Sequence, residues 1–249
     1  MKHKGEKITA LTAYDASMSK LLNQCEIDIV LVGDSVGNVK LGYDNTIPVT
    51  VSEMLHYTKA VKRGNSSALL VADMPYLSYQ LSIEEAKANA GRLIKEGGAE
   101  AVKIEGGLES ANVVKALVDI NIPVMGHLGL TPQSIYKMGG YSMQGKTPES
   151  QEKCITDAKI LEGAGVFAIV LECIPEELAR VITQKVKVPT IGIGAGAACD
   201  GQVLVLDDLL GLTEGKIPSF VKPYAQLRDT VVKAVQRYRK DVKNSDFPN

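Results

Sequence analysis

The feature that most constrains the fold is a repeating alternation of short apolar runs and helix-length segments. Eight apolar runs of three to six residues are bounded by Gly, Pro or Asp, as buried parallel strands tend to be. Eight strands in 249 residues give one strand–helix unit per about 31 residues, which is the spacing of an α/β protein with a (β/α)8 barrel. The strand candidates are Lys7–Thr12, Ile29–Val32, Ala68–Ala72, Ala101–Ile104, Val124–Gly126, Phe167–Leu171, Thr190–Ile193 and Gln202–Val205.

Helices are predicted between most of these strands. Ser82-Ile83-Glu84-Glu85 has the form of a capping box and predicts a helix start, and Gly97-Gly98 predicts its end. A long amphipathic segment, Tyr224–Val242, predicts a C-terminal helical extension. No linker or change of composition interrupts the chain, so we expect a single barrel domain over residues 1–249. The remaining helix candidates are Ala16–Gln24, Val51–Arg63, Ser110–Asp119, Glu149–Ala164 and Glu176–Lys185.

An open, doubly wound sheet is the alternative architecture, because it has the same strand spacing. The first strand lacks the glycine fingerprint that such sheets use for dinucleotides. A glycine-rich segment occurs only late, at Gly192-Ile193-Gly194-Ala195-Gly196, in the form GxGxG and without a clear following helix. Two interpretations remain open for this segment, a tight turn or a phosphate-binding loop, and the weak motif favours the turn.

Composition excludes several classes of function. The formal net charge is −1 and the isoelectric point is about 6.3, which argues against a nucleic-acid-binding protein. No apolar run approaches the roughly 20 residues of a membrane helix, and the charged Met1–Lys7 lacks a signal-peptide core, so a cytoplasmic location is expected. The cysteines contain no CxxC pair, so we expect four free, mostly buried thiols at Cys25, Cys154, Cys173 and Cys199.

Two connections are longer than the four to six residues that are typical of loops. They are Gly33–Thr50 and Leu128–Thr147, and the second contains Tyr136 and Tyr141 among four glycines. The second loop is either a mobile lid over a pocket or an ordered excursion that contacts another subunit.

Ionisable side chains follow five successive predicted strands. They are Asp34, Asp73, Glu105, His127 and Glu172. In parallel α/β barrels, active sites lie at the carboxyl ends of the strands, so these side chains are expected to share one site. Each acid taken alone is also explained by helix capping or by pairing with a lysine.

Three carboxylates in one barrel mouth repel one another unless a cation compensates them. Lys103 and Glu105 are two apart on a strand and therefore point to the same side. With Asp34 and Asp73, Glu105 forms an oxygen-only ligand set, which favours Mg²⁺ over Zn²⁺. Lys103 is expected to act as a positive charge toward substrate, although a structural counter-ion or a Schiff base is not excluded.

The remaining two ionisable side chains have open roles. Glu172 lies two strands from Glu105 and is free to act as a general base, or it pairs with a cation in a structural role. His127 either hydrogen-bonds a substrate or caps its loop.

The chain resembles the ketopantoate hydroxymethyltransferase (3-methyl-2-oxobutanoate hydroxymethyltransferase) family of the phosphoenolpyruvate/pyruvate barrel superfamily. The similarity extends from about Ile8 to Pro218, and its longest motifs are highly specific. The segments that carry it are Val32-Gly33-Asp34-Ser35, Pro48-Val49-Thr50, Ala72-Asp73-Met74-Pro75, Val102-Lys103-Ile104-Glu105-Gly106-Gly107, Gly126-His127-Leu128-Gly129-Leu130-Thr131-Pro132-Gln133-Ser134 and Gly192-Ile193-Gly194-Ala195-Gly196.

The resemblance implies specific roles at the matching positions. Asp34, Asp73 and Glu105 match the positions associated with Mg²⁺, and Glu172 matches the proton acceptor. The positions that contact the keto acid are matched by Asp34, Ser35, Asp73 and Lys103, to which we add His127 as a substrate-binding candidate. The chain departs from the family before the first strand, where members commonly carry an extra helix and only seven residues precede Ile8.

The implied reaction transfers a hydroxymethyl group from 5,10-methylenetetrahydrofolate to 3-methyl-2-oxobutanoate, through a Mg²⁺-stabilised enolate. Its product is 2-dehydropantoate (ketopantoate), in the first step of pantothenate biosynthesis. The expected partners are this 2-oxo acid and the folate, with neither nucleic acid nor membrane, and the family implies a homo-oligomer, often a decamer. The alternatives are a Mg²⁺-dependent 2-oxo acid C–C lyase on the same barrel, whose usual Lys-Lys-Cys-Gly-His loop is absent, and a non-catalytic metabolite-binding barrel.

Overall fold

A computed structural model describes residues 1–215 and 217–248 of the chain. These residues divide into two compact units, Met1–Val203 and Leu204–Asn249. The single domain expected over residues 1–249 stays a prediction.

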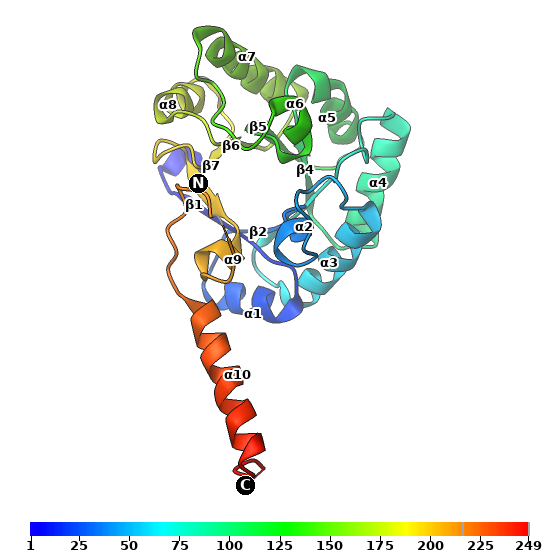
Figure 1. Ribbon diagram of the computed structural model, residues 1–249. Helices are drawn as coiled ribbons and strands as arrows, with labels where there is room; N and C mark the ends of the chain where they lie inside the picture. The colour runs from blue at the N-terminus through cyan, green and yellow to red at the C-terminus, as the bar shows by residue number, and fades with distance from the viewer. Residues whose placement is uncertain (216, 249) are drawn as a thin grey trace. The chain divides into compact units, whose positions relative to one another are not determined.

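The first unit contains a closed barrel of parallel strands, in the order β1 to β8 around the barrel. The predicted (β/α)8 architecture is therefore confirmed, and the alternative of an open sheet is wrong. Helices surround the strands in a ring (Figure 1). The strands are β1 (Ile8–Thr12), β2 (Ile29–Val32), β3 (Leu69–Asp73), β4 (Ala101–Glu105), β5 (Val124–Gly129), β6 (Ala168–Glu172), β7 (Thr190–Ile193) and β8 (Gly201–Leu204).

The helices of this unit start where capping residues supply acceptors for free backbone N–H groups. Ser82 Oγ accepts from Glu85 N at 3.1 Å, as its motif predicts, and Thr50 and Glu53 form a reciprocal capping box. The elements are η1 (Lys2–Lys4), α1 (Ala16–Gln24), α2 (Val36–Val39), α3 (Val51–Gly64), α4 (Ile83–Lys95), η2 (Leu108–Ser110), α5 (Ala111–Val118), η3 (Pro132–Ser134), α6 (Ile135–Met138), α7 (Pro148–Ala164) and α8 (Glu176–Lys185).

The predicted boundaries agree with these bounds to within one or two residues at most elements. Among the strands the largest difference is at β5, which runs three residues beyond the predicted Gly126. This extension exists because Leu128 and Gly129 stay paired with Leu171 and Glu172 of β6. The short helices α2 and α6 were not predicted, because four-residue helices leave no periodic pattern.

The second unit contains α9 (Leu206–Leu209) and α10 (Leu227–Lys243). Between them the chain returns to α9, where Tyr224 N donates to Leu209 O at 2.8 Å and Leu227 N donates to Leu210 O at 2.9 Å. The predicted C-terminal helical extension is confirmed, although α10 begins at Leu227 and not at Tyr224.

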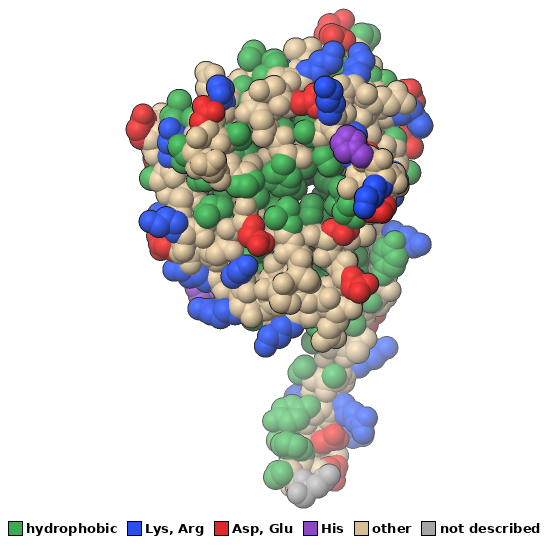
Figure 2. Space-filling view, turned by 180° about the vertical axis from the view of Figure 1, so that it is seen from behind, with side chains coloured by type: hydrophobic (Ala, Val, Ile, Leu, Met, Phe, Trp, Pro, Cys, Tyr) green, Lys and Arg blue, Asp and Glu red, His purple; other side chains and the backbone are tan. Residues whose placement is uncertain are grey.

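The barrel interior is filled by every second residue of the strands, as the period of two requires. On β4 the alternation places Ala101, Lys103 and Glu105 on one side, and Ala101 belongs to the apolar interior cluster. On the face of the molecule seen in Figure 2, hydrophobic side chains gather around the centre and charged ones lie around the rim. The interior cluster consists of Ile8, Ala10, Ile29, Leu31, Val71, Ala101, Met125, Ala168, Val170, Ile191 and Val203.

The opposite strand faces pack against the helices. Val30, Leu70 and Ile169 are buried on that side, as are Met54 of α3 and Leu93 of α4. Burial of an apolar side chain of this size is worth about 1.5–3 kcal/mol. The two apolar layers therefore hold the strands rigidly, and with them the side chains at the strand ends.

Two further findings bear on the sequence predictions. None of the helices in the described ranges is both long and apolar enough to cross a membrane. All four cysteines are free thiols, but the expectation that they are mostly buried is wrong, because only Cys199 is buried and Cys25 is exposed. Cys25 ends α1 at the surface, where the apolar periodicity of that helix no longer applies.

Candidate active site

The inward-facing side chains change from apolar to ionisable at the carboxyl end of the barrel. Strand register sets this layer, since Asp73 is paired with Lys103, Glu105 with His127, and Gly129 with Glu172. The side chains of Asp73, Lys103, Glu105 and His127 are at most 5% exposed, and that of Glu172 is 17% exposed. The structure thus brings together the five strand-end residues that the sequence singled out, with Asp34 joined to Asp73 by a hydrogen bond.

The three carboxylates share a common arrangement, in which one oxygen of each is held by an N–H group. Asp34 N donates to Asp73 Oδ2 at 3.0 Å, the side-chain amide of Gln133 donates to Asp34 Oδ2 at 2.9 Å, and Gln133 N donates to Glu105 Oε2 at 3.0 Å. The other oxygens of Asp73 and Glu105 face cations: Asp73 Oδ1 lies 3.2 Å from Lys103 Nζ, and Glu105 Oε1 lies 3.5 Å from His127 Nδ1.

Burial and crowding destabilise the charged forms of these acids. Burial, followed by the charges of Asp73 and Glu105, raises the pKa of Asp34 to about 8. Burial also raises the pKa of Asp73, although Lys103 opposes it. Burial and repulsion among the carboxylates therefore oppose their simultaneous ionisation.

Lys103 is the buried cation of the cluster. Its Nζ lies 3.2 Å from Asp73 Oδ1 and 3.1 Å from His127 Nδ1. Burial works against its charge, but the carboxylates of Asp73, Glu105 and Asp34 outweigh burial and raise the pKa of Lys103 above its ordinary value. A permanently charged lysine is a poor amine nucleophile, so this environment favours the electrostatic role over a Schiff base.

His127 connects the carboxylate cluster to Glu172. Its Nε2 lies 3.1 Å from Glu172 Oε2, and its Nδ1 lies 3.5 Å from Glu105 Oε1. Burial and Lys103 disfavour the charged imidazole, but the interactions with Glu105 and Glu172 outweigh them and raise its pKa to about 9. Nδ1 donates to Glu105 when it is protonated and accepts from Lys103 when it is not. The hydrogen-bond partner of Nδ1 therefore depends on the protonation of the ring.

Ser35 stands at the edge of this layer, at the start of α2. Its Oγ shares a hydrogen bond of 2.8 Å with the hydroxyl of Tyr14, and its side chain is partly exposed. Its substrate-binding role stays a prediction, as do the roles of the other site residues.

Gln133 and Tyr79 are members of this network that the sequence analysis assigned no role. Gln133 is 5% exposed, and its Oε1 accepts from the hydroxyl of Tyr79 at 2.8 Å. Glu105 N in turn donates to that hydroxyl at 3.2 Å. A glutamine in a loop gives no sequence signal of burial, and Tyr79 is 54 residues away from it, so only the fold reveals the pair.

The long loop after β5 is attached at both ends to the residues around Glu172. Leu130 N donates to Glu172 O at 2.8 Å, and Gln144 N donates to Cys173 O at 2.9 Å. Its Tyr136 hydroxyl accepts from Asn45 Nδ2 of the other long loop at 3.4 Å. The loop contains η3 and α6, so it has ordered secondary structure, and its function as a lid stays a prediction.

The glycine-rich segment after β7 is a tight turn. Gly194 and Gly196 have positive φ angles, and a side chain at Gly196 would meet Glu176 at 2.4 Å. The segment leads into β8 and opens no helix, so it lacks the helix N-terminus of a phosphate-binding loop.

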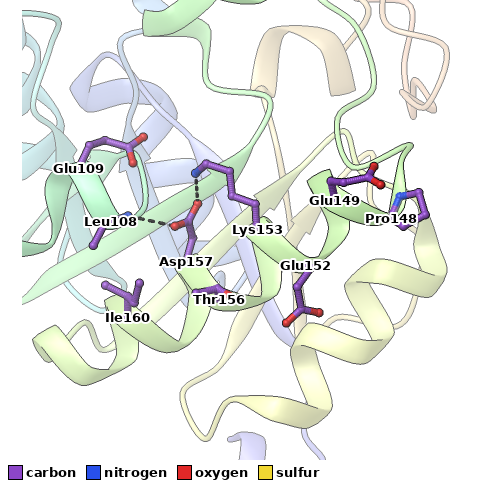
Figure 3. Close-up of a pocket in the computed structure, with 9 residues that line it drawn as sticks. All are labelled: Leu108, Glu109, Pro148, Glu149, Glu152, Lys153, Thr156, Asp157 and Ile160. Atoms are coloured by element: carbon purple, nitrogen blue, oxygen red, sulfur yellow. Dashed lines mark hydrogen bonds and ion pairs between the residues drawn. The ribbon is translucent and has the colours of Figure 1, made fainter.

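A separate hollow of about 770 Å³ lies along α7, and it contains none of the strand-end residues. Figure 3 shows the side chains of Lys153 and Asp157 pointing toward each other, with Leu108 N bonded to Asp157 Oδ1 at 3.2 Å. Asp157 thereby fastens the loop that follows Glu105. The hollow is lined by Leu108, Glu109, Pro148, Glu149, Glu152, Lys153, Thr156, Asp157 and Ile160.

The donor chemistry of the cluster fits a hard divalent cation. Its acceptors are carboxylate oxygens, two of which face Lys103 and His127, and burial and mutual repulsion oppose ionisation of Asp34. In the described part of the chain, however, no three His, Cys, Asp or Glu side chains share a common point at ligand distance. The carboxylates face Lys103 and Gln133 instead.

Comparison with known proteins identifies the family. The family model described as ketopantoate hydroxymethyltransferase matches residues 1–249. The chain belongs to the ketopantoate hydroxymethyltransferase family. A 3-methyl-2-oxobutanoate hydroxymethyltransferase of Thermoanaerobacter sp. (strain X514) is 56% identical over 248 residues, which cover 100% of this chain and 90% of that protein. The protein of the same name from Geobacter metallireducens is 55% identical over 249 residues, covering 100% and 93%.

Solved structures of similar fold come from more distant proteins. A phosphonopyruvate hydrolase in complex with oxalate and Mg²⁺ has a TM-score of 0.64 at 13% identity, covering 98% of this chain and 84% of that one. A 2,3-dimethylmalate lyase has a TM-score of 0.64 at 16% identity, covering 100% and 86%. At these identities the likeness shows a shared fold, so the chemistry of this ketopantoate hydroxymethyltransferase family member is argued from its own residues.

Proposed function

We propose that this chain transfers a hydroxymethyl group from 5,10-methylenetetrahydrofolate to 3-methyl-2-oxobutanoate and forms 2-dehydropantoate. The observation that carries the proposal is the contact between Glu172 and His127 beside a buried cluster of one lysine and three acids. In a chain of this family, that arrangement supplies a base, a positive charge and a set of cation ligands in one layer. The reaction is the first step of pantothenate biosynthesis.

The chain's own residues account for proton removal. Glu172 takes the proton from C3 of the keto acid, and the electron pair of that C–H bond moves toward the 2-oxo group. Lys103 places a positive charge near the developing negative oxygen, in a buried layer where such charges act most strongly. His127 orients the Glu172 carboxylate through its Nε2 atom. Ser35 donates a hydrogen bond to the substrate carboxylate.

Asp34, Asp73 and Glu105 would hold Mg²⁺. When bound, the metal supplies positive charge that polarises the 2-oxo group and makes the C3 proton more acidic. The buried oxygens Asp73 Oδ1 and Glu105 Oε1 support this ligand set, because they already face positive or protonatable groups, Lys103 at 3.2 Å and His127 at 3.5 Å.

The carbon–carbon bond forms between C3 of the keto acid and the methylene carbon of the folate. That carbon bridges two folate nitrogens, and both of its C–N bonds break. One water supplies the hydroxyl oxygen, the proton taken from C3 and one proton of the water end on the two nitrogens, and tetrahydrofolate is released. The roots of the long loop after β5 bond to the backbone of Glu172 and Cys173, which supports a role of this loop beside the reacting carbon.

The test is exchange of the C3 proton of 3-methyl-2-oxobutanoate, followed by NMR in D2O with protein and Mg²⁺ but without folate. We expect exchange that requires Mg²⁺ and that falls by about two to four orders of magnitude in Glu172→Gln, the usual contribution of a general base. Keto-acid binding should persist in that variant. Exchange at the wild-type rate would remove Glu172 as the base.

The same experiment separates this proposal from the alternatives. Absence of exchange in the wild-type protein, even after addition of the folate donor, would return the function to a Mg²⁺-dependent lyase or a binding protein. Asp73→Ala should weaken Mg²⁺ binding in a calorimetric titration. An unchanged Mg²⁺ affinity would remove Asp73 from the ligand set.

We also infer a cytoplasmic homo-oligomer, with the decamer that the family implies. A stripe of exposed apolar side chains on α10 supports self-association, with Val231, Val235, Tyr238 and Val242 at 53%, 59%, 56% and 44% exposure. Their spacing of four, three and four residues places them along one side of the helix. Sedimentation velocity of the protein should give a single large species, and a monomer at micromolar concentration would contradict this inference.

A further inference from the structure

The side chain of Gln133 is buried in the strand-end layer, and its amide has only one orientation. The Tyr79 hydroxyl lies 2.8 Å from Oε1 and 3.2 Å from Glu105 O. Met74 O, at the other end of the amide, can only accept, so Nε2 faces Met74 and Oε1 faces Tyr79. Nε2 consequently faces two acceptors, Asp34 Oδ2 and Met74 O, each at 2.9 Å. Both amide protons are therefore used, and the donor toward Asp34 cannot be exchanged for an acceptor.

The same residue also reaches Glu105, through its backbone. Gln133 N donates to Glu105 Oε2 at 3.0 Å, while Glu105 N donates to the Tyr79 hydroxyl at 3.2 Å. Gln133 thus connects the ends of β2 and β4 to the loop after β5. Tyr79 connects the loop after β3 to the same group of residues. One neutral residue, through its side chain and its backbone N–H, connects the ends of four successive strands.

These bonds fix one oxygen of each of two carboxylates, those of Asp34 and Glu105. The oxygens that Gln133 holds are Asp34 Oδ2 and Glu105 Oε2, and the oxygen that remains on Glu105, Oε1, is buried and lies 3.5 Å from His127 Nδ1. A neutral donor that fixes one oxygen of a carboxylate leaves the other oriented for a cation without adding charge to the site. Outer partners of this kind typically change metal affinity 10- to 100-fold when they are removed.

We propose that Gln133, itself oriented by Tyr79, is a positioning residue that presents Asp34 and Glu105 to the divalent cation. The proposal rests on the Mg²⁺-dependent function proposed above. Gln133 does not touch the reacting atoms in this assignment, so its loss should weaken the cation site more than the chemistry that follows. A purely structural role would instead lower the amount of folded protein and leave the affinity of that folded protein unchanged.

The test compares Gln133→Met with Gln144→Met. Both glutamines lie on the loop after β5, but the side chain of Gln144 bonds only to Ser142 among the described residues. Mg²⁺ affinity is measured by calorimetry, thermal unfolding is followed by circular dichroism, and the C3 exchange rate is recorded against Mg²⁺ concentration.

For Gln133→Met we expect Mg²⁺ affinity to fall about 10- to 100-fold and the half-saturating Mg²⁺ concentration for exchange to rise equally. The exchange rate at saturating Mg²⁺ should recover to within about fivefold of wild type. Gln144→Met should match the wild-type protein in both measurements. A Gln133→Met protein whose Mg²⁺ affinity lies within twofold of wild type would overturn the proposal, whatever its thermal stability.

Tyr79→Phe supplies a second variant in case Gln133→Met folds poorly. It removes the bond to Oε1 and leaves the Gln133 side chain in place, so the amide can turn away from Asp34. We expect a weaker Mg²⁺ affinity in this variant and no additional loss in the double variant, because both changes act on the same bond to Asp34. Additive losses would contradict the proposed chain from Tyr79 to Asp34.

The wild-type arm separates this inference from the proposed function. If the wild-type protein shows neither Mg²⁺ binding nor Mg²⁺-dependent exchange, the function and the positioning role both fail. If the wild-type protein shows both and Gln133→Met is indistinguishable from it, only the positioning role fails.

Discussion

Gly129 packs directly against the backbone of Glu172, so adding one methyl group at Gly129 has a predictable effect on the site. Gly129 ends β5 opposite Glu172, with a φ of +94°, and a Cβ atom there would lie 2.1 Å from Glu172 O and 2.8 Å from Ile174 Cγ2. A carbon normally stays about 3.3 Å or more from a carbonyl oxygen, so Gly129→Ala must push the backbone of Glu172 by about 1 Å.

The magnitude follows from this displacement. Misplacement of a reacting group by 1 Å can cost about 10²-fold in rate, so we expect Gly129→Ala to lower C3 exchange by about that factor. Strain at positive φ adds about 1–2 kcal/mol and overpacking about 1–3 kcal/mol, for a destabilisation of about 2–5 kcal/mol. Many domains have a total stability of about 5–15 kcal/mol, so the variant should still fold.

Gly139→Ala is the matched control. Gly139 lies on the same loop with a φ of +71°, but nothing lies within 4 Å of its added Cβ. This variant should carry only the backbone strain and should exchange the C3 proton at nearly the wild-type rate. Exchange rates are compared by NMR at saturating keto acid and Mg²⁺, with folding checked by circular dichroism. Equal rates in the two variants would refute the reasoning that Gly129 sets the position of Glu172.

Three further predictions concern other parts of the barrel unit. Mg²⁺ at 100 times its dissociation constant should stabilise the folded protein by about 2.7 kcal/mol, measured as a rise in Tm that Asp73→Ala should lack. The absence of such a rise in the wild-type protein would speak against a cation site in the folded state. Burial raises the pKa of Cys154 to about 11, so its thiolate fraction at pH 8 is about one in a thousand. Iodoacetamide should therefore label the exposed Cys25 first, and labelling of Cys154 should grow about tenfold per pH unit up to pH 10. Equal labelling rates at pH 8 would contradict this order. A Cβ at Gly107 would lie 2.2 Å from Asp157 Cγ, so Gly107→Ala should lower Tm, and adding Asp157→Ala should recover part of the loss; purely additive losses would show that the collision is not the cause.

The sequence predicts the barrel and its inward-facing charged layer because both depend on period-two patterns within single strands. Alternation places Lys103 and Glu105 on one side of β4, and closure of the barrel then aligns Glu105 with His127. These relations require only the pattern along the strand and the parallel order of the strands.

The remaining features of the site depend on loops, in which no period constrains direction. The bond between Gln133 and Asp34 spans 99 residues, and the backbone bond from Gln133 to Glu105 spans 28. Neither follows from local pattern, because a loop glutamine is normally exposed. Likewise, the predicted end of β5 at Gly126 is too early, since the pairing of Gly129 with Glu172 is set by the neighbouring strand.

The attachment of the long loop at Leu130 and Gln144 determines how far the length of this loop can vary without a change in the barrel. Both roots bond to consecutive carbonyls, those of Glu172 and Cys173, so the intervening segment is an excursion whose ends are fixed by β6. Doubling the length of a flexible loop with fixed ends costs only about 0.6 kcal/mol. The part of the excursion beyond Gln133 can therefore gain or lose residues while β6, the strand that carries Glu172, stays unchanged.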